Sequence, residues 1–175
     1  MSKTKGRMDV ISKTFLDLVH THQGIIYKIC RVYAHTPDDQ DDLFQEVLLN
    51  AWKSYPRFEG ASKFSTWLYR VALNTALMYK RKQQRSIVAE RVEDGVLENM
   101  APEKSEDTEP LRRLESAITQ LEPVEKALIV LYLEEVSYAD MAVIMGLTES
   151  NVGVKINRIK KQLKQIMEAG NHGKR

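Results

Sequence analysis

The stretch SYADMAVIMGLTESNVGVKINRIKKQL, residues 137–163, decides the fold of the C-terminal part of the chain. It begins with Ser137 and Asp140 in the S-x-x-D spacing of a helix capping box. Gly146 follows a short apolar segment, where a glycine can take the left-handed conformation that ends a helix. Thr148 can then cap a longer basic segment, whose apolar residues recur at helical spacing: Val152, Ile156, Ile159 and Leu163. The stretch predicts two helices joined by a tight turn, a helix-turn-helix.

The second helix of this pair leaves polar side chains on the faces away from its apolar positions. They are Glu149, Ser150, Asn151, Lys155 and Arg158. Polar groups near the start of such a helix can reach base edges in a major groove, and cations can neutralise phosphates. Many packed helical pairs share this pattern. From these residues alone, DNA binding and purely structural packing both stay open.

The segments before this stretch are helical in pattern as well. Residues 111–132 carry two apolar stripes, with Pro123 in the first turn of the second. Further stripes occupy residues 10–19, 25–33, 43–52 and 64–77. No segment alternates with period two over a convincing length, so the sequence predicts an all-α protein.

Local signals predict where the helices of the first half begin and end. Pro37 breaks the first pattern, and Asp38 and Asp39 are candidate caps for the helix that follows. Tyr55–Pro56 ends that helix, and Ser62 is the candidate cap of the next one.

Residues 92–110, VEDGVLENMAPEKSEDTEP, separate the two helical groups. They hold seven acidic residues and one lysine, a net charge of −6, whereas the whole chain carries +2. Two prolines and a glycine interrupt the segment, and no apolar period runs through it. We therefore predict two small helical domains, residues 8–91 and 111–169, joined by a flexible acidic linker. Basic tracts on both sides of the linker suggest two contacts with a polyanion, although solvated helix faces would explain them equally well.

Composition excludes several other classes of protein. The chain of 175 residues is 43% apolar and 29% charged, as globular proteins are. A single cysteine, Cys30, rules out an intramolecular disulfide, and no Cys/His pair has zinc-finger spacing. No apolar run approaches the roughly 20 residues of a membrane helix, and the basic start MSKTKGRMDV lacks the apolar core of an export signal. We expect a cytoplasmic protein without membrane insertion.

The acidic run Asp38–Asp42 has three possible interpretations. It resembles half of a DDxxD magnesium site, but no second motif accompanies it. Acidic residues also stabilise the first turn of a helix through its dipole. The third interpretation is a docking surface for a basic partner. His20, His22 and His35 have no recognised ligand spacing, and neither a nucleophile–base pair nor a phosphate-binding glycine loop is present, so we expect no enzyme, no metal and no cofactor.

Residues 62–85 interleave aromatic and cationic side chains, a combination that can stack on unpaired bases while holding the phosphate backbone. Trp67 has the spacing of a core residue. Phe58 and Phe64, on either side of Gly60, are better candidates for contact with an extruded base.

With these motifs in order, residues 10–165 resemble the extracytoplasmic-function (ECF) sigma factors of bacterial RNA polymerase, in the sigma-70 family. DDLFQEVLLNAW, residues 41–52, resembles the helix by which such factors bind the coiled coil of the largest polymerase subunit. FEGASKFSTWLYRVALN, residues 58–74, with the basic cluster after it, resembles their −10 recognition and melting segment. Residues 121–163 resemble their −35-reading helix-turn-helix.

The resemblance implies a role for three groups of residues. The polymerase-binding group is Asp41, Asp42, Leu43, Gln45, Glu46 and Trp52. The group for −10 DNA is Phe58, Phe64, Arg70, Asn74, Lys80, Arg81 and Arg85. The group for −35 DNA is Ser150, Asn151, Lys155 and Arg158. Gly153 and Val154 depart from the family pattern, because polar or basic residues are common at these positions.

The implied function is promoter-specific initiation of transcription, with residues 8–91 as sigma region 2 and 111–169 as sigma region 4. The implied partners are core RNA polymerase, promoter DNA and an anti-sigma factor that holds the two domains inactive. The mechanism would be binding and strand separation rather than covalent chemistry. A conventional helix-turn-helix regulator, which binds duplex DNA tightly without polymerase, and a magnesium-dependent enzyme are the alternatives.

Overall fold

The computed structural model describes the backbone of residues 2–90 and 109–172, and the side chains of residues 13–85 and 109–169. The predicted linker, residues 92–110, lies outside the description except for its last two residues. Within the described ranges all regular structure is helical, which confirms the predicted all-α class. The chain divides into two compact units, Met1–Tyr79 and Lys80–Arg175. The limits predicted for the two functional domains, 8–91 and 111–169, stay a prediction.

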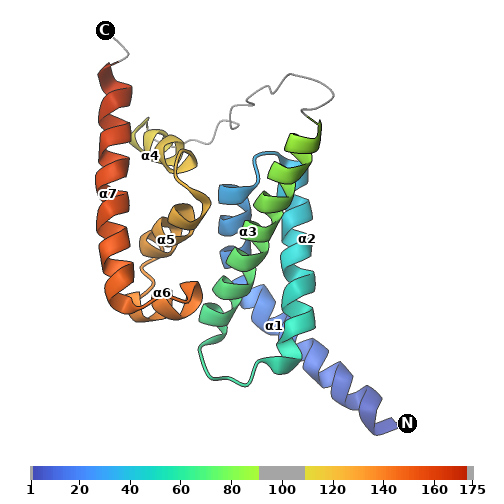
Figure 1. Ribbon diagram of the computed structural model, residues 1–175. Helices are drawn as coiled ribbons and strands as arrows, with labels where there is room; N and C mark the ends of the chain where they lie inside the picture. The colour runs from blue at the N-terminus through green and yellow to red at the C-terminus, as the bar shows by residue number, and fades with distance from the viewer. Residues whose placement is uncertain (1, 91–108, 173–175) are drawn as a thin grey trace. The chain divides into compact units, whose positions relative to one another are not determined.

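The first unit consists of α1 (Ser2–Tyr33), α2 (Pro37–Ser54), the 3-10 turn η1 (Tyr55–Arg57) and the start of α3 (Phe64–Glu90). Figure 1 shows the three long helices alongside one another, with the first turns of α1 projecting beyond the other two. α3 runs unbroken past the boundary between the units. The two apolar sets predicted at 10–19 and 25–33 lie on one continuous helix.

The core of this unit follows from helical spacing. α2 buries Leu43, Val47 and Ala51, which are four residues apart and therefore share one face. α3 contributes Leu68, Ala72 and Ala76 with the same spacing, and its two alanines leave room for a neighbouring helix. From α1 come further buried residues: Phe15, Val19, Ile26, Ile29, Cys30 and Tyr33.

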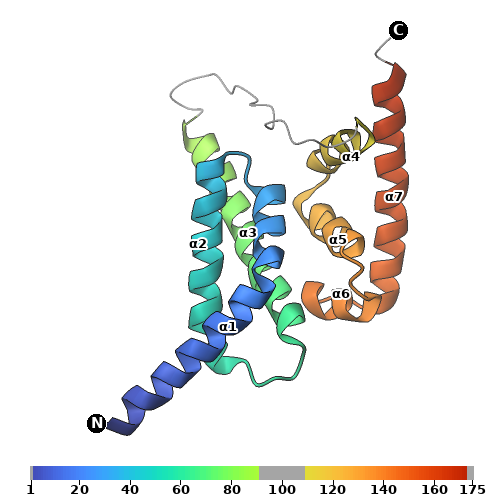
Figure 2. The same cartoon turned by 180° about the vertical axis from the view of Figure 1, so that it is seen from behind.

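The second unit contains α4 (Glu109–Thr119), α5 (Pro123–Leu133), α6 (Tyr138–Met145) and α7 (Glu149–His172). Figure 2 shows α4, α5 and α6 along one side of α7. Each of the three helices packs on α7, which buries Val152, Ile156, Ile159 and Leu163 against them. The four residues predicted for the inward face of this helix are confirmed as core.

The helix ends of the second unit match the local signals in the sequence. Ser137 accepts a hydrogen bond from the Asp140 backbone N–H at 3.1 Å, and its hydroxyl donates to the Asp140 carboxylate at 2.8 Å. Thr148 accepts from the Asn151 backbone N–H at 3.3 Å. Gly146 has φ 66°, a left-handed conformation that costs glycine little and other residues more. The helix-turn-helix is confirmed together with its caps.

Two predicted caps of the first unit are wrong. α2 is capped by Thr36, which accepts from the Asp39 backbone N–H at 3.1 Å, and Pro37 occupies the first turn, so Asp38 and Asp39 are inside the helix. α3 begins at Phe64 rather than directly after Ser62, whose hydroxyl donates to the Lys63 carbonyl at 3.4 Å. At α2 several capping residues stand close together and the geometry of the turn selects Thr36, whereas at α3 the first helical bond runs from the Trp67 N–H to the Lys63 carbonyl, one residue after Ser62.

Cys30 is 1% exposed, and burial together with the charge of Asp41 raises the pKa of its thiol to about 11. We expect iodoacetamide to alkylate Cys30 at pH 8 at least about 100-fold more slowly in the folded protein than in denaturant, because the thiolate fraction falls tenfold per pKa unit. Mass spectrometry of timed samples measures both rates. Since the folded pKa exceeds its ordinary value of 9.0, this thiol favours the fold below pH 9 and ceases to do so as the pH rises through about 11. Equal alkylation rates in the folded and unfolded chains would contradict the buried position.

Candidate nucleic-acid interface and partner surfaces

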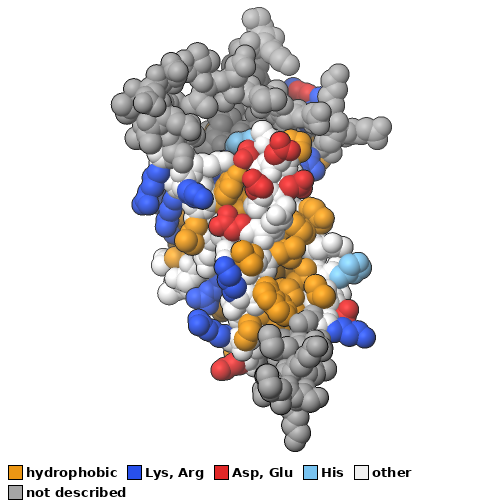
Figure 3. Space-filling model, turned by 90° about the vertical axis from the view of Figure 1, so that its right-hand side faces the viewer, with side chains coloured by type: hydrophobic (Ala, Val, Ile, Leu, Met, Phe, Trp, Pro, Cys, Tyr) orange, Lys and Arg blue, Asp and Glu red, His pale blue; other side chains and the backbone are white. Residues whose placement is uncertain are grey.

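One face of α2 combines acidic and apolar side chains. Asp41, Asp42, Gln45 and Glu46 are exposed, as a partner-binding role requires. Leu43 is 0% exposed and points into the core, so it cannot meet a partner directly. Trp52, from the same group, is 39% exposed and packs edge-on against Phe15, with ring centroids 5.2 Å apart. Figure 3 shows acidic side chains near one end of this side of the unit and a band of hydrophobic side chains beside them.

α1 adds apolar side chains to this surface that the sequence pattern did not predict. Leu16 is 63% exposed and Tyr27 is 55% exposed, although each lies next to a buried residue of α1, Phe15 and Ile26. The Tyr27 ring stacks on Phe44 of α2, with centroids 4.6 Å apart. Leu49 of α2, 50% exposed, adds a further apolar side chain. The sequence signal for these exposed residues is that α1 carries apolar side chains on more of its circumference than one buried face occupies.

Polar contacts hold α3 against α2. The Tyr79 hydroxyl donates to Asp39 Oδ1 at 2.7 Å, while Thr36 donates to Oδ2 of the same carboxylate at 2.8 Å. Further along, Asn50 donates its amide to the Thr75 hydroxyl at 3.2 Å. Both carboxylate oxygens of Asp39 therefore accept hydrogen bonds that join α2 to its own first turn and to α3. Among the described residues, no cluster of three or more His, Cys, Asp or Glu side chains could hold a metal ion.

An aromatic cluster forms where η1 and the following loop meet α3. Phe58 lies near Trp67 and Phe64, with ring centroids 5.2 Å and 5.9 Å apart. Tyr55 also joins the cluster, and His22 of α1 packs against Phe64 at 5.3 Å. Phe64 is only 9% exposed, whereas Phe58 and Trp67 are half-buried. Of the two predicted base-stacking residues, Phe58 is thus the accessible one and Phe64 supports it.

The polar residues predicted on α3 form a stripe. At roughly 100° per residue, four of them fall within about 60° of one another, and all four are exposed: Arg70, Asn74, Arg81 and Arg85. Lys80 lies off this stripe, half-buried, and donates to Gln83 Oε1 at 3.1 Å. The helix therefore presents a narrow cationic row along one side, a shape that can follow a nucleic-acid backbone.

The helix-turn-helix presents its predicted residues to solvent. Ser150, Asn151, Lys155 and Arg158 are all exposed on α7, away from the core. Gly153 faces α6, where an added Cβ would lie 3.6 Å from Cε2 of Tyr138. Val154 is 57% exposed. A capped short helix, a glycine turn and a second helix with polar outward residues form the geometry that enters a major groove.

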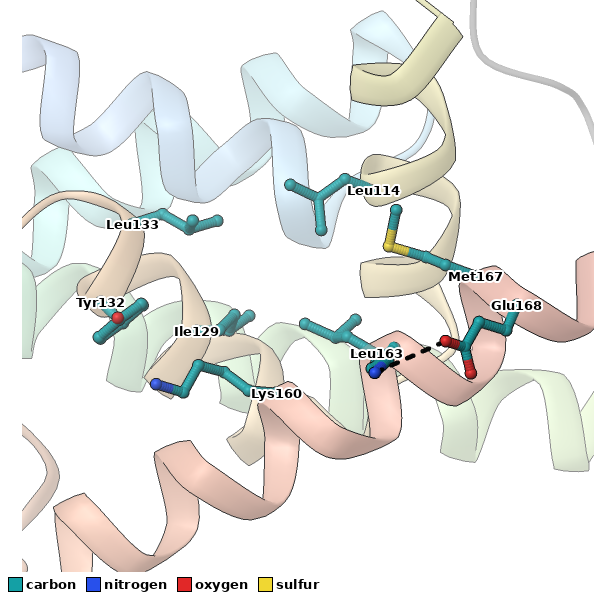
Figure 4. Close-up of a pocket in the computed structure, with 9 residues that line it drawn as sticks. Leu114, Ile129, Tyr132, Leu133, Lys160, Leu163, Met167 and Glu168 are labelled. Carbon is teal, nitrogen blue, oxygen red and sulfur yellow. Dashed lines mark ion pairs between the residues drawn. The ribbon is translucent and has the colours of Figure 1, made fainter.

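A separate apolar groove lies on the second unit between α4, α5 and α7. Its volume is about 390 Å³, and Leu114, Ile129 and Leu163 line it. In Figure 4, Lys160 lies on the α7 side of the groove near Tyr132, with the ammonium 5.1 Å from the ring centroid. The ion pair between Lys164 and Glu168, 3.8 Å long, lies at the other end. None of the four predicted −35 residues lines this groove.

None of the described helices combines the length and the apolar character needed to cross a lipid bilayer. Burial raises the pKa values of Cys30 and Tyr33 and lowers that of Lys126. None of these three belongs to the predicted contact groups.

Comparison with protein families gives two matches in the order that the sequence predicted. Residues 18–86 match Sigma-70 region 2, and residues 111–163 match Sigma-70 region 4. The ECF RNA polymerase sigma factor SigW of Bacillus subtilis is 26% identical over 93% of this chain and 93% of its own. The ECF RNA polymerase sigma-E factor of Escherichia coli strain K12 is 30% identical over 86% of this chain and 85% of its own.

Solved structures share the fold. The sigma factor RpoE, in complex with the anti-sigma factor NepR from Bartonella quintana, matches with a TM-score of 0.75 and 21% identity, over 89% of this chain and 98% of that one. CnrH, in complex with the cytosolic domain of CnrY, matches with a TM-score of 0.65 and 24% identity, over 90% of each chain. From the family matches and the full-length relatives, the chain belongs to the ECF RNA polymerase sigma factors of the sigma-70 family, which direct promoter-specific transcription initiation by recognising DNA and are not enzymes.

Proposed function

We propose that this chain carries out sigma-factor function through three surfaces, one on each of α2, α3 and α7. Core polymerase binds the outer face of α2, through Asp41, Asp42, Gln45, Glu46 and Trp52. The −10 element binds Phe58, Arg70, Asn74, Lys80, Arg81 and Arg85, with Phe64 behind them. The −35 element binds Ser150, Asn151, Lys155 and Arg158. One observation carries the proposal: on α2 and α7 every predicted contact residue is exposed, apart from Leu43.

In this proposal Leu43 stabilises α2 in the core and does not itself touch polymerase, because it is fully buried. The apolar face that α1 adds extends the area available to polymerase, through Leu16, Tyr27 and Leu49. A partner complementary to this face would place cations against the carboxylates of α2 and apolar side chains against the hydrophobic band.

The chemistry at the −10 element is strand opening. Extruding a base costs a few kcal/mol, and stacking it on an aromatic ring returns about 1–3 kcal/mol. Phe58 offers the ring, since it is half-buried at the edge of the aromatic cluster and its neighbours restrict its motion. Stacking alone does not cover the cost of opening several base pairs, so binding to polymerase must supply the rest. The free chain should therefore bind promoters weakly.

The proposal includes the organisation predicted from sequence, with residues 8–91 working as region 2, residues 111–169 as region 4, and 92–110 as the linker between them. It also includes a cytoplasmic location and control by an anti-sigma factor. The solved relatives bound to NepR and to the cytosolic domain of CnrY support that control. A purified candidate partner should suppress transcription by the reconstituted enzyme, and a partner that binds without suppressing it would count against this part.

The test is reconstitution with sigma-free core polymerase and a promoter library. We expect promoter-dependent transcripts with the wild-type chain, and about 5- to 150-fold less opening at the −10 element with Phe58→Ala, as the loss of about 1–3 kcal/mol of stacking implies. Permanganate reactivity of unpaired thymines measures the opening.

Phe58→Tyr is the matched control, because it keeps the ring and should keep the opening. Absence of promoter-dependent transcription with the wild-type chain would overturn the proposal, and so would tight promoter binding by the free chain. That second result would favour a conventional helix-turn-helix regulator.

A further inference from the structure

One apolar side chain interrupts the polar face of α7. Val154 is 57% exposed, although the other valine of this helix, Val152, is 0% exposed. At roughly 100° per residue, Val154 points about 170° away from the mean direction of the four buried residues of α7. It therefore lies at the centre of the outward face of the helix.

The surroundings of Val154 on this face are polar. One turn before it lies Ser150 and one turn after it lies Arg158, and both are exposed. Asn151 and Asn157, three residues away on either side, are exposed as well. A β-branched residue at an exposed helical position has lower helix propensity than alanine or lysine, so Val154 adds little to the stability of its own unit.

We infer that Val154 contacts the C5 methyl group of a thymine in the −35 element. The inference rests on the proposed placement of α7 in the major groove. In that groove every base pair presents hydrogen-bond donors or acceptors, and thymine alone adds a methyl group. An alkyl side chain forms no hydrogen bonds, so a thymine methyl is the group in the groove that it complements. Opposite cytosine, adenine or guanine the valine would leave polar base atoms without partners.

Buried residues on either side fix the orientation of this valine. Val152 and Ile156, two residues before and two residues after Val154, are both 0% exposed. They hold α7 against the rest of its unit with Val154 on the outward face. Ser150, Asn151 and Arg158 can then form hydrogen bonds with the flanking bases and phosphates, while the valine specifies a single position as thymine.

The test compares thymine with deoxyuridine, which pairs identically but lacks the C5 methyl group. Holoenzyme made from core polymerase and the full chain first selects bound duplexes from a randomised library. In a selected sequence, each thymine of the −35 element is then replaced singly by deoxyuridine, and binding is measured. We expect a loss of about fourfold at one thymine for the wild-type chain, which is the effect of one buried methyl group.

Val154→Ala should bind the thymine duplex about fourfold more weakly and show no difference between thymine and deoxyuridine at that position. Val143→Ala is the matched control, because Val143 is 52% exposed on α6 and loses the same atoms. This variant should keep the wild-type dependence on the methyl group. Alanine favours helix at both positions, so both variants should fold, and circular dichroism checks this.

Two results would overturn the inference. One is a wild-type protein that is indifferent to deoxyuridine at every thymine of the −35 element, and the other is a methyl dependence that persists in Val154→Ala. Failure of the proposed function would look different. If α7 does not bind the −35 element, holoenzyme carrying Arg158→Ala should bind that element as tightly as wild-type holoenzyme does. This result would be visible with ordinary thymine-containing duplexes.

Discussion

Replacing Lys155 and Arg158 together with alanine is expected to lower the affinity of the reconstituted holoenzyme for its promoter by about 100-fold. A base contact by arginine contributes about 1–3 kcal/mol, and we assign about 1 kcal/mol to the phosphate contact of the lysine. The sum of about 2–4 kcal/mol corresponds to a loss of about 30- to 1000-fold in affinity. Both side chains are exposed on α7 and make no part of the core, so the variant should stay folded. Filter binding or fluorescence anisotropy at several salt concentrations measures the loss.

The matched control removes the same two charges from another side of the same helix. Lys160 and Lys164 line the apolar groove, and their replacement by alanine leaves the −35 residues in place. We expect this pair to change promoter affinity much less. Loss of a phosphate contact should also reduce the slope of log affinity against log salt by about one for the Lys155/Arg158 variant. Equal losses in both double variants would mean that net charge, and not position on α7, determines binding, which contradicts the proposed interface.

Leu43→Ala is expected to lower the free energy of unfolding of the first unit by about 2–5 kcal/mol, because it removes a fully buried side chain and leaves a cavity. Leu49→Ala, the same substitution on the same helix at a residue 50% exposed, should cost much less stability. Both tryptophans of the chain, Trp52 and Trp67, belong to the first unit. Their fluorescence during urea denaturation therefore reports the unfolding of this unit.

The same pair of variants separates packing from contact at the polymerase surface. Folded Leu43→Ala should bind core polymerase with nearly wild-type affinity, whereas Leu49→Ala should bind more weakly while it stays folded. The opposite result would contradict this prediction: fully folded Leu43→Ala would lose polymerase binding and Leu49→Ala would keep it. Leu43 would then contribute to the polymerase contact and Leu49 would not.

Local signals in the sequence were sufficient for much of the second unit. Ser137, Gly146 and Thr148 act within three or four residues of themselves, and a helix-turn-helix depends on such short-range chemistry. The four inward residues of α7 follow from its regular spacing, which one side of a long helix imposes. For the same reason the outward residues proposed for DNA could be predicted before the structure was known.

The first unit was harder to predict because its details depend on contacts between helices. Thr36, Asp38 and Asp39 can all cap a helix, and the turn after α1 selects Thr36. Phe58 and Phe64 have the same side chain and lie six residues apart, but only Phe64 packs against His22 of α1 and becomes buried. The exposed Leu16 and Tyr27 look like core residues in the sequence. Only the positions of the neighbouring helices leave them uncovered.

The hydrogen bond from Tyr79 to Asp39 makes the beginning of α2 a poor place to look for separation-of-function alleles. Tyr79 lies between Asn74 and Arg81 on α3, so losing the acceptor at Asp39 removes a bond that holds α3 to α2 in the middle of the proposed −10 residues. A mutant selected there for weak polymerase binding would carry a hidden defect in promoter opening, and suppressors would arise for both. Alleles that affect polymerase alone should come from Gln45, Glu46 or Trp52, more than one helical turn further along α2, where no such bond to Tyr79 is shared.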